Sequence, residues 1–216
     1  MSDYVQAQRD YYRLRCEKAV DALKSRGFDA VVVEDSGSAV EAVLEMVDPG
    51  AKVGVPGTVT IRQLGLMERL QARGNEVVQH WVGGLSAEEM RGLRLEQMTS
   101  DVLLTSTNAV TLDGRLINID GSGNRVAAMV FGPGRVIVVA GANKIAHDVE
   151  EGTNRAKRVA GPINALRLGG QAPCTRTGYC VDCSPPVSIC NVTVIMDGKP
   201  SGTEVTVILV PEDLGY

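Results

Sequence analysis

The sequence has few aromatic residues, only two histidines and no long apolar run. Phe, Trp and Tyr make up 4% of the 216 residues, so a core must be built mainly from Val, Ile, Leu and Ala. A membrane helix needs about 20 consecutive apolar residues. The longest candidate, AAMVFGPGRVIVVAG, is interrupted by Gly, Pro and Arg. The chain is therefore expected to be globular and to have no membrane span.

An excess of basic charge and a secretory leader are also missing. The formal net charge is -4, which argues against general affinity for nucleic acid, because such binding needs a basic surface. The N-terminal stretch MSDYVQAQRDYYRLRC is charged and contains no apolar signal segment. We therefore expect a cytoplasmic protein, and a reducing cytoplasm disfavours structural disulfides.

Common catalytic motifs are absent as well. The sequence contains no GxSxG, no HExxH, no Walker A pattern and no GxGxxG. His147 begins a predicted helix, so a surface or capping role explains it better than a role as catalytic base. Asp120 is the best candidate for general acid or base chemistry, because it lies beside a Gly-rich loop.

Strand-like and helix-like segments alternate along the chain. Predicted strands cover 29–34, 52–57, 76–80, 101–111, 135–144 and 204–210. Predicted helices cover 4–26, 36–47, 58–74, 86–100 and 146–168, the last interrupted near Gly161 and Pro162. An Asp-Gly turn predicts a hairpin around 107–120, and 191–196 is a possible partner strand for 204–210. This order indicates a single α/β domain over 1–216, with a mostly parallel sheet flanked by helices.

Four polar loops are expected at one edge of this sheet, where open α/β folds bind ligands. They cover 54–58, 105–108, 120–125 and 141–144. Glycine lets backbone N–H groups approach an anion closely, and Arg125 and Lys144 add positive charge. Plain turn chemistry explains any one loop equally well. Four such loops together indicate a site for a small anionic ligand.

The remaining distinctive feature is the segment PCTRTGYCVDCSPPVSIC. Its cysteines follow the pattern C-x5-C-x2-C-x6-C and are Cys174, Cys180, Cys183 and Cys190. Two thiolates separated by two residues can bind one metal ion or two corners of a cluster. A four-thiolate iron–sulfur cluster (4Fe-4S) is favoured, structural zinc is the alternative, and free thiols are the third interpretation. Cys16, alone on the first helix, is expected to be a buried apolar residue.

The stretch TSTNAVTLDGRLINIDGSGNRVAAMVFGPGRVIVVAGANKI, the PCTRTGYCVDC run and the closing LGY closely resemble the LUD-domain family of lactate-utilisation proteins. The resemblance covers essentially the whole chain, with 1–27 as an N-terminal helix and 171–190 as a metal-binding loop. It implies the fold of ribose-5-phosphate isomerase, glucosamine-6-phosphate deaminase and the coenzyme A transferases. By position, it implies the pocket residues Gly54, Gly57, Thr58, Thr107, Asn108, Gly121, Gly123, Asn124, Arg125, Asn143 and Lys144.

The family resemblance also implies a pathway. We expect an accessory or subunit of an iron–sulfur lactate-oxidising system that binds a lactate-like acid or a phosphorylated compound. Iron–sulfur redox subunits are the expected partners, and a homodimer is plausible. None of the pocket loops contains the Glu nucleophile of coenzyme A transferases. The alternatives are a stand-alone isomerase or hydrolase of a small phosphorylated metabolite with structural zinc, and a non-catalytic scaffold.

Overall fold

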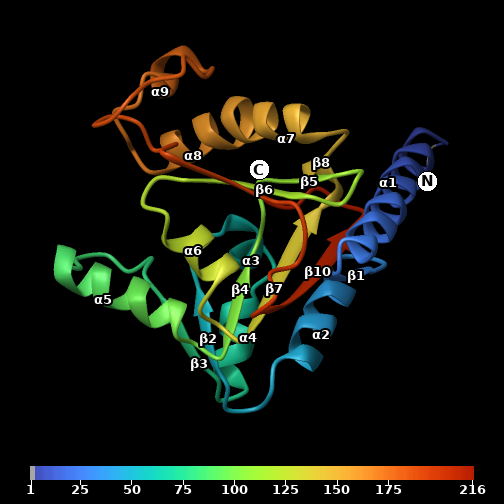
Figure 1. The fold of residues 1–216 in the computed structure, drawn as a ribbon, viewed down its shortest axis with the longest axis horizontal. Helices are drawn as coiled ribbons and strands as arrows, with labels where there is room; N and C mark the ends of the chain where they lie inside the picture. Colours follow the sequence, from blue (N-terminus) through green and yellow to red (C-terminus); the bar gives the residue numbers. More distant parts are fainter. Residues whose placement is uncertain (1–2) are drawn as a thin grey trace.

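The structure is a computed structural model that describes residues 3–216. Its main sheet has six strands, all parallel, in the order β1-β10-β7-β4-β2-β3 (Figure 1). The strands are β1 (Asp29–Val32), β2 (Lys52–Val55), β3 (Glu76–Gln79), β4 (Val102–Thr105), β7 (Arg135–Gly141) and β10 (Glu204–Val210). The predicted α/β class with a mostly parallel sheet is confirmed.

Helices cover both faces of the main sheet and define two cores. Val136, Val138 and Ala140 of β7 belong to one core, and Ile137 and Val139 to the other, because neighbouring side chains of a strand point to opposite faces. The first core includes α1 (Asp3–Ser25) and α6 (Asn124–Val130). The second includes α2 (Ser36–Met46), α3 (Val59–Gln63) and α4 (Leu66–Ala72). Burial on both faces explains why β7 reads as an almost unbroken apolar run.

A second, smaller sheet lies above the carboxyl ends of the main strands in Figure 1. Its order is β8-β5-β6-β9, with β8 (Ile145–Ala146), β5 (Ala109–Thr111), β6 (Leu116–Asp120) and β9 (Val192–Met196). The predicted hairpin is present as the antiparallel pair of β5 and β6. The predicted pairing of 191–196 with 204–210 is wrong. β9 pairs with β6, whereas β10 lies between β1 and β7 of the main sheet.

The remaining helices frame the edge where the two sheets meet. They are α5 (Ala87–Met98), the 3-10 turn η1 (Ala142–Lys144), α7 (Val149–Arg155), the π turn η2 (Ala156–Ala160), α8 (Gly161–Arg167) and α9 (Cys174–Thr177). The predicted helix over 58–74 is in fact two helices, because Gly65 adopts a left-handed backbone with φ 63° between α3 and α4. The predicted interruption near Gly161 and Pro162 is present as the π turn immediately before Gly161.

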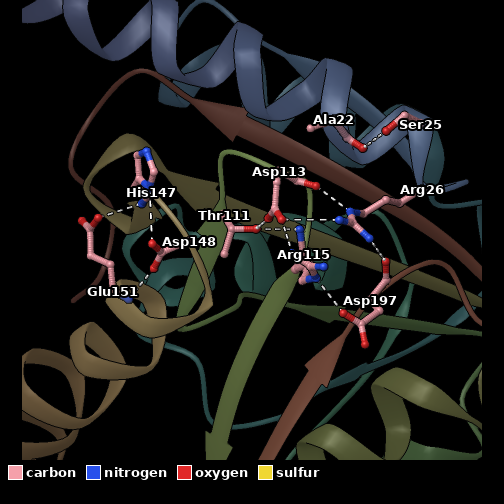
Figure 2. A network of polar contacts seen from close by, with 10 residues as sticks. All are labelled: Ala22, Ser25, Arg26, Thr111, Asp113, Arg115, His147, Asp148, Glu151 and Asp197. Atoms are coloured by element: carbon pink, nitrogen blue, oxygen red, sulfur yellow. Dashed lines mark hydrogen bonds and ion pairs between the residues drawn. The ribbon is translucent and has the colours of Figure 1, made fainter.

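A polar network fastens the β5–β6 hairpin to α1 and β9 (Figure 2). Arg26 donates to the backbone carbonyls of Asp113 and Asp197. Arg115 reaches the Asp197 carboxylate at 2.6 Å and also pairs with Asp113. At the tip, Gly114 has φ 87°, and a Cβ there would lie 2.4 Å from the Ala22 carbonyl of α1. The turn therefore needs glycine for both its backbone conformation and its close approach.

Replacing Gly114 with Ala should lower the free energy of unfolding by roughly 2–5 kcal/mol, because left-handed strain and an overpacked contact add together. Chemical denaturation measures the change. Gly50→Ala is the matched control, since Gly50 has φ 80° and a Cβ there would meet no atom within 4 Å, and should cost only about 1–2 kcal/mol. Equal losses in both variants would show that the contact with α1 contributes nothing.

Candidate functional site

A cavity of roughly 290 Å³ lies at the carboxyl ends of the main strands, between the two sheets and α8. We call it the strand-end cavity. The loops after β2 and β4 and the turn after β7 contribute side chains to it, because parallel strands place their carboxyl ends at one edge. The loop after β6 of the second sheet completes the lining. Of the predicted pocket residues, its lining contains Gly57, Thr58, Thr107, Asn108, Gly121, Asn124, Arg125 and Lys144, together with Asp120.

Three predicted pocket residues lie outside this lining, and each has a structural role instead. A Cβ on Gly54 would lie 2.8 Å from the backbone oxygen of Gln97, so Gly54 lets α5 pack on β2. Gly123 has φ 80° and precedes the first residue of α6. The Asn143 side chain accepts from the backbone N–H of Leu214 at 3.1 Å and holds the C-terminal segment.

Asp120 and Arg125 form a buried ion pair beside the cavity. The guanidinium Nη2 lies 2.7 Å from Asp120 Oδ1, with both side chains about one-tenth exposed. Asp120 also accepts from the backbone N–H of Val126 at the start of α6. Arg125 further donates to the Ser106 carbonyl at 3.1 Å and to Asn108 Oδ1 at 2.9 Å. Asp120, the candidate base, is thus paired with a cation. The guanidinium of Arg125, predicted to bind an anion, is bound by protein oxygens instead.

Lys144 lies at the buried side of the cavity and is 4% exposed. Its Nζ donates to the hydroxyl oxygens of Thr60 at 2.8 Å and Ser106 at 2.9 Å, and no carboxylate of residues 3–216 forms an ion pair with it. Burial, together with repulsion from Arg155 and Arg125, lowers the pKa of Lys144 to about 7. About half of the amine is therefore uncharged at pH 7, whereas an ordinary lysine is almost fully charged there.

Several lining residues were not among the predicted site residues. They are His80, Trp81, Arg94, Asn164, Arg167 and Tyr216. They come from separate parts of the chain, and no local motif marks them. The guanidinium carbon of Arg62 lies 4.1 Å from the Trp81 ring centroid, and that of Arg167 lies 4.2 Å from it. Stacking on an aromatic ring holds a guanidinium in place while leaving its N–H groups available.

Two polar atoms in the wall of the cavity have no protein partner. Arg94 Nε and Thr58 Oγ1 are buried, and neither forms a hydrogen bond. The Arg94 side chain is fixed at its other end, where Nη1 donates to Ser122 at 3.2 Å. Buried polar atoms are normally satisfied, so the lack of a partner within residues 3–216 is unusual at both positions. His80, hydrogen-bonded to Gln97, has its pKa lowered by burial and by Arg94, and favours the neutral ring.

The four clustered cysteines line a second, smaller cavity of about 30 Å³, which we call the cysteine cavity. All are free thiols, and burial followed by repulsion from the other three raises the pKa of Cys190. Between residues 3 and 216, no group of three or more His, Cys, Asp or Glu side chains stands close enough to hold a metal ion. The donor set fits a four-thiolate metal or cluster, but the loop must contract before the thiols bind one.

The two cavities share a wall. Gly161, Ile189 and Cys190 line both of them. A Cβ on Gly161 would lie 3.4 Å from Cys190 Sγ, so glycine permits this approach. The backbone N–H of Asn191 donates to the Asp120 carbonyl at 2.9 Å. The cysteine segment is thus bonded directly to the strand that carries the ion pair.

Comparison with known protein families identifies the fold. A family model described as the LUD domain matches residues 16–210 of the chain. The chain belongs to the LUD-domain family. The resemblance found in the sequence is therefore confirmed. No match was found among curated proteins.

Two solved structures resemble this LUD domain. One is a DUF162 family protein from Deinococcus radiodurans, 17% identical, with a TM-score of 0.52 over 94% of this chain and 98% of that one. The other is eIF2B beta from Chaetomium thermophilum, 15% identical, with a TM-score of 0.39 over 53% of this chain and 44% of that one. The first supports the fold of the LUD domain. In the described part of the chain, no helix is long and apolar enough to cross a membrane.

The lowered pKa of Lys144 predicts a specific pH dependence of stability. An unfolded lysine keeps its proton up to a pH of about 10.4, whereas the folded domain releases it near 7. The unfolded state therefore binds more protons between these values, and stability rises with pH across this window. Below pH 7 the amine is charged in both the folded and the unfolded state, so the full cost of burying the charge lowers the free energy of unfolding.

Lys144→Met should remove this rise. Relative to the Met variant, the wild-type free energy of unfolding should increase by at least about 1.4 kcal/mol between pH 7 and 10, which corresponds to one pKa unit. Urea denaturation at several pH values measures the difference, and the exposed Lys18→Met serves as control. Parallel curves for wild type and Lys144→Met would show that the pKa of Lys144 is ordinary.

Proposed function

We propose that this LUD-domain protein binds a small organic acid or phosphorylated compound in the strand-end cavity and acts as an accessory or subunit of an iron–sulfur, lactate-oxidising system. The observation that carries the first part is the charge of the lining. Three arginines, Arg94, Arg125 and Arg167, line the cavity with one acidic side chain, Asp120, which is paired with Arg125, and Lys144 adds an amine donor. An anion entering the cavity meets an excess of hydrogen-bond donors.

Size and unmet hydrogen bonds support a small ligand. A cavity of roughly 290 Å³ is at the lower end of the range for small-molecule sites, about 300–1,000 Å³. Arg94 Nε and Thr58 Oγ1 are buried without partners, and a carboxylate or phosphate oxygen would satisfy them. A lactate-like acid has the right charge and few enough atoms. Arg125 would act mainly by positioning Asn108 and Asp120, because its N–H groups already contact protein oxygens.

The cysteine segment supports the iron–sulfur part of the proposal. Cys174, Cys180, Cys183 and Cys190 would hold a 4Fe-4S cluster, with zinc as the alternative. When bound, such a cluster would supply one-electron transfer. The backbone N–H of Asp182 already donates to Cys180 Sγ at 3.4 Å, a contact that tunes thiolate ligands. A reducing cytoplasm would keep these thiols free for metal.

A protein partner would accept or supply the electrons. Exposed apolar side chains flank the cysteine cavity on α8 and on the cysteine segment: Ile163, Leu166, Tyr179, Val181 and Val187. Apolar residues grouped around a site are typical of interaction surfaces. An iron–sulfur subunit bound to this surface would bring its own cluster near the cluster of this chain. The alternative is that a second copy of the chain covers the surface.

The anion site can be tested by calorimetry with lactate, pyruvate and inorganic phosphate. Arg94→Gln should weaken the binding of the preferred anion by roughly 10- to 100-fold, since a hydrogen bond to a charged group contributes about 1.5–3 kcal/mol. Arg91→Gln is the matched control, because Arg91 is exposed on the same helix and lies outside the lining. Equal affinity in both variants, or no heat from any of the three anions, would count against the site.

The metal site can be tested on anaerobically purified protein by metal analysis and absorption spectroscopy. We expect about four irons per chain and a broad thiolate-to-iron absorption band. Cys183→Ser should lose both, whereas Cys16→Ala should keep them, because Cys16 is buried in the core under α1. One zinc in colourless protein would instead support the non-redox alternative. Protein without either metal would refute the metal-binding role.

A further inference from the structure

Lys144 has an unusual hydrogen-bond arrangement for a buried lysine. Its two partners, the hydroxyl oxygens of Thr60 and Ser106, carry protons of their own that are directed elsewhere. Thr60 Oγ1 donates to the Leu214 carbonyl and Ser106 Oγ to the Thr107 carbonyl, both at 3.5 Å. In this arrangement Nζ donates to both hydroxyl oxygens.

The surroundings of Nζ offer two hydroxyl partners and, among the described residues, no carboxylate. A charged ammonium group has three donors, and among the described residues only Thr60 and Ser106 accept from Nζ. The third position of Nζ, a proton in the charged form and a lone pair in the neutral form, is left for the cavity that Lys144 lines. A neutral amine has two N–H groups and one lone pair, so both donors are satisfied. Repulsion from Arg125 and Arg155 favours the same form.

The lone pair of this amine is at the wall of a cavity suited to anions. Lys144 lines the strand-end cavity together with Thr58, whose buried Oγ1 has no protein partner. Arg94 and Arg167 line the same cavity. Neither forms an ion pair within residues 3–216, although Arg167 Nε and Nη2 already donate to Asn164 and Tyr216. A neutral buried lysine beside an anion site is the arrangement needed for nucleophilic attack on a carbonyl compound.

We propose that Lys144 is a nucleophile that forms an imine with the carbonyl carbon of a 2-oxo acid bound in the strand-end cavity. This inference rests on the proposed anion-binding function, because the basic residues must hold the acid's carboxylate while Nζ reacts. It adds a covalent step that the family assignment does not include. It also separates two related ligands, since a 2-oxo acid can react and a 2-hydroxy acid cannot.

The step balances without an oxidant or reductant. A bond forms from Nζ to the carbonyl carbon as the carbonyl π bond breaks and its oxygen takes a proton. The carbon–oxygen bond then breaks, and the oxygen leaves as water with one proton from Nζ and one from solvent. The product is a protonated imine between Lys144 and the acid.

The test is reductive trapping at pH 7 with pyruvate and sodium cyanoborohydride, followed by intact mass and peptide mapping. We expect one lysine adduct, on the peptide containing Lys144. The N-terminal α-amino group, with an ordinary pKa of about 7.7–8.0, also reacts and is distinguished by its own peptide. An exposed lysine of ordinary pKa has only about one free amine in a few thousand at this pH, so labelling of other lysines should be at least about a hundredfold slower. Lactate in place of pyruvate should give no adduct.

Variants and a binding measurement make the outcome unambiguous. Lys144→Met and Lys144→Arg should both lose the adduct, whereas Lys157→Arg should keep it, because Lys157 pairs with Asp182 outside the strand-end cavity. Circular dichroism checks that each variant is folded. Calorimetry with pyruvate and lactate on wild-type protein separates the two claims. Pyruvate that binds without forming an adduct would refute the role of Lys144 as a nucleophile, and so would adducts spread over many lysines. Failure of both pyruvate and lactate to bind would instead refute the binding of organic acids in the strand-end cavity.

Discussion

The buried ion pair between Asp120 and Arg125 is the interaction on which the site depends. Its atoms connect three segments that are separate in the sequence: the loop after β4, the end of β6 and the start of α6. Two charges taken from water are costly unless further hydrogen bonds complete them. Here Asn108 Oδ1 and the Ser106 carbonyl accept from the guanidinium. Removing one partner would leave a buried charge unpaired, at a cost of about 3–5 kcal/mol.

This network also determines where the free positive charge of the cavity comes from. The Arg125 guanidinium is occupied by protein oxygens. An incoming anion must therefore be bound by other side chains of the lining. Arg94 has a buried Nε without a partner, and Arg167 is stacked on Trp81. The two arginines are held by neutral groups, so their charge is not cancelled locally. The ion pair holds the walls of the cavity together, and Arg94 and Arg167 supply the positive charge that the proposed anion would meet.

Much of the fold could be predicted from the sequence because its signals are local. Apolar runs such as 135–141 indicate buried strands, and polar turns after them indicate strand ends, so the grouping of four loops at one edge followed from the α/β order. Pairing between distant strands has no such local signal. β9 and β10 look alike in sequence, but β9 joins β6 and β10 joins β7.

The sequence was a poorer guide to the contacts in the site than to the fold, again because these contacts join distant segments. Arg125 and Lys144 were identified from their loops, but a charged residue in sequence does not reveal what it contacts. Arg125 turned out to be saturated by protein oxygens, and Lys144 to be buried without a carboxylate. Trp81, Arg94 and Tyr216 reach the cavity from three separate segments, so only the folded chain brings them together. The shared wall at Cys190 is likewise a tertiary feature that spacing alone cannot predict.

The position of Lys144 is informative because it opposes folding stability. A methionine of similar length would fill the same space without a charge to desolvate, and the Thr60 and Ser106 hydroxyls already donate to backbone carbonyls. Packing therefore gives no reason to retain an amine there. A protein commonly keeps a destabilising group where its chemistry is needed, and a perturbed ionisable group in a cavity is characteristic of functional sites. The Thr60 and Ser106 hydroxyls hydrogen-bond Nζ, and its remaining position is left for the cavity, which is how the fold accommodates the amine.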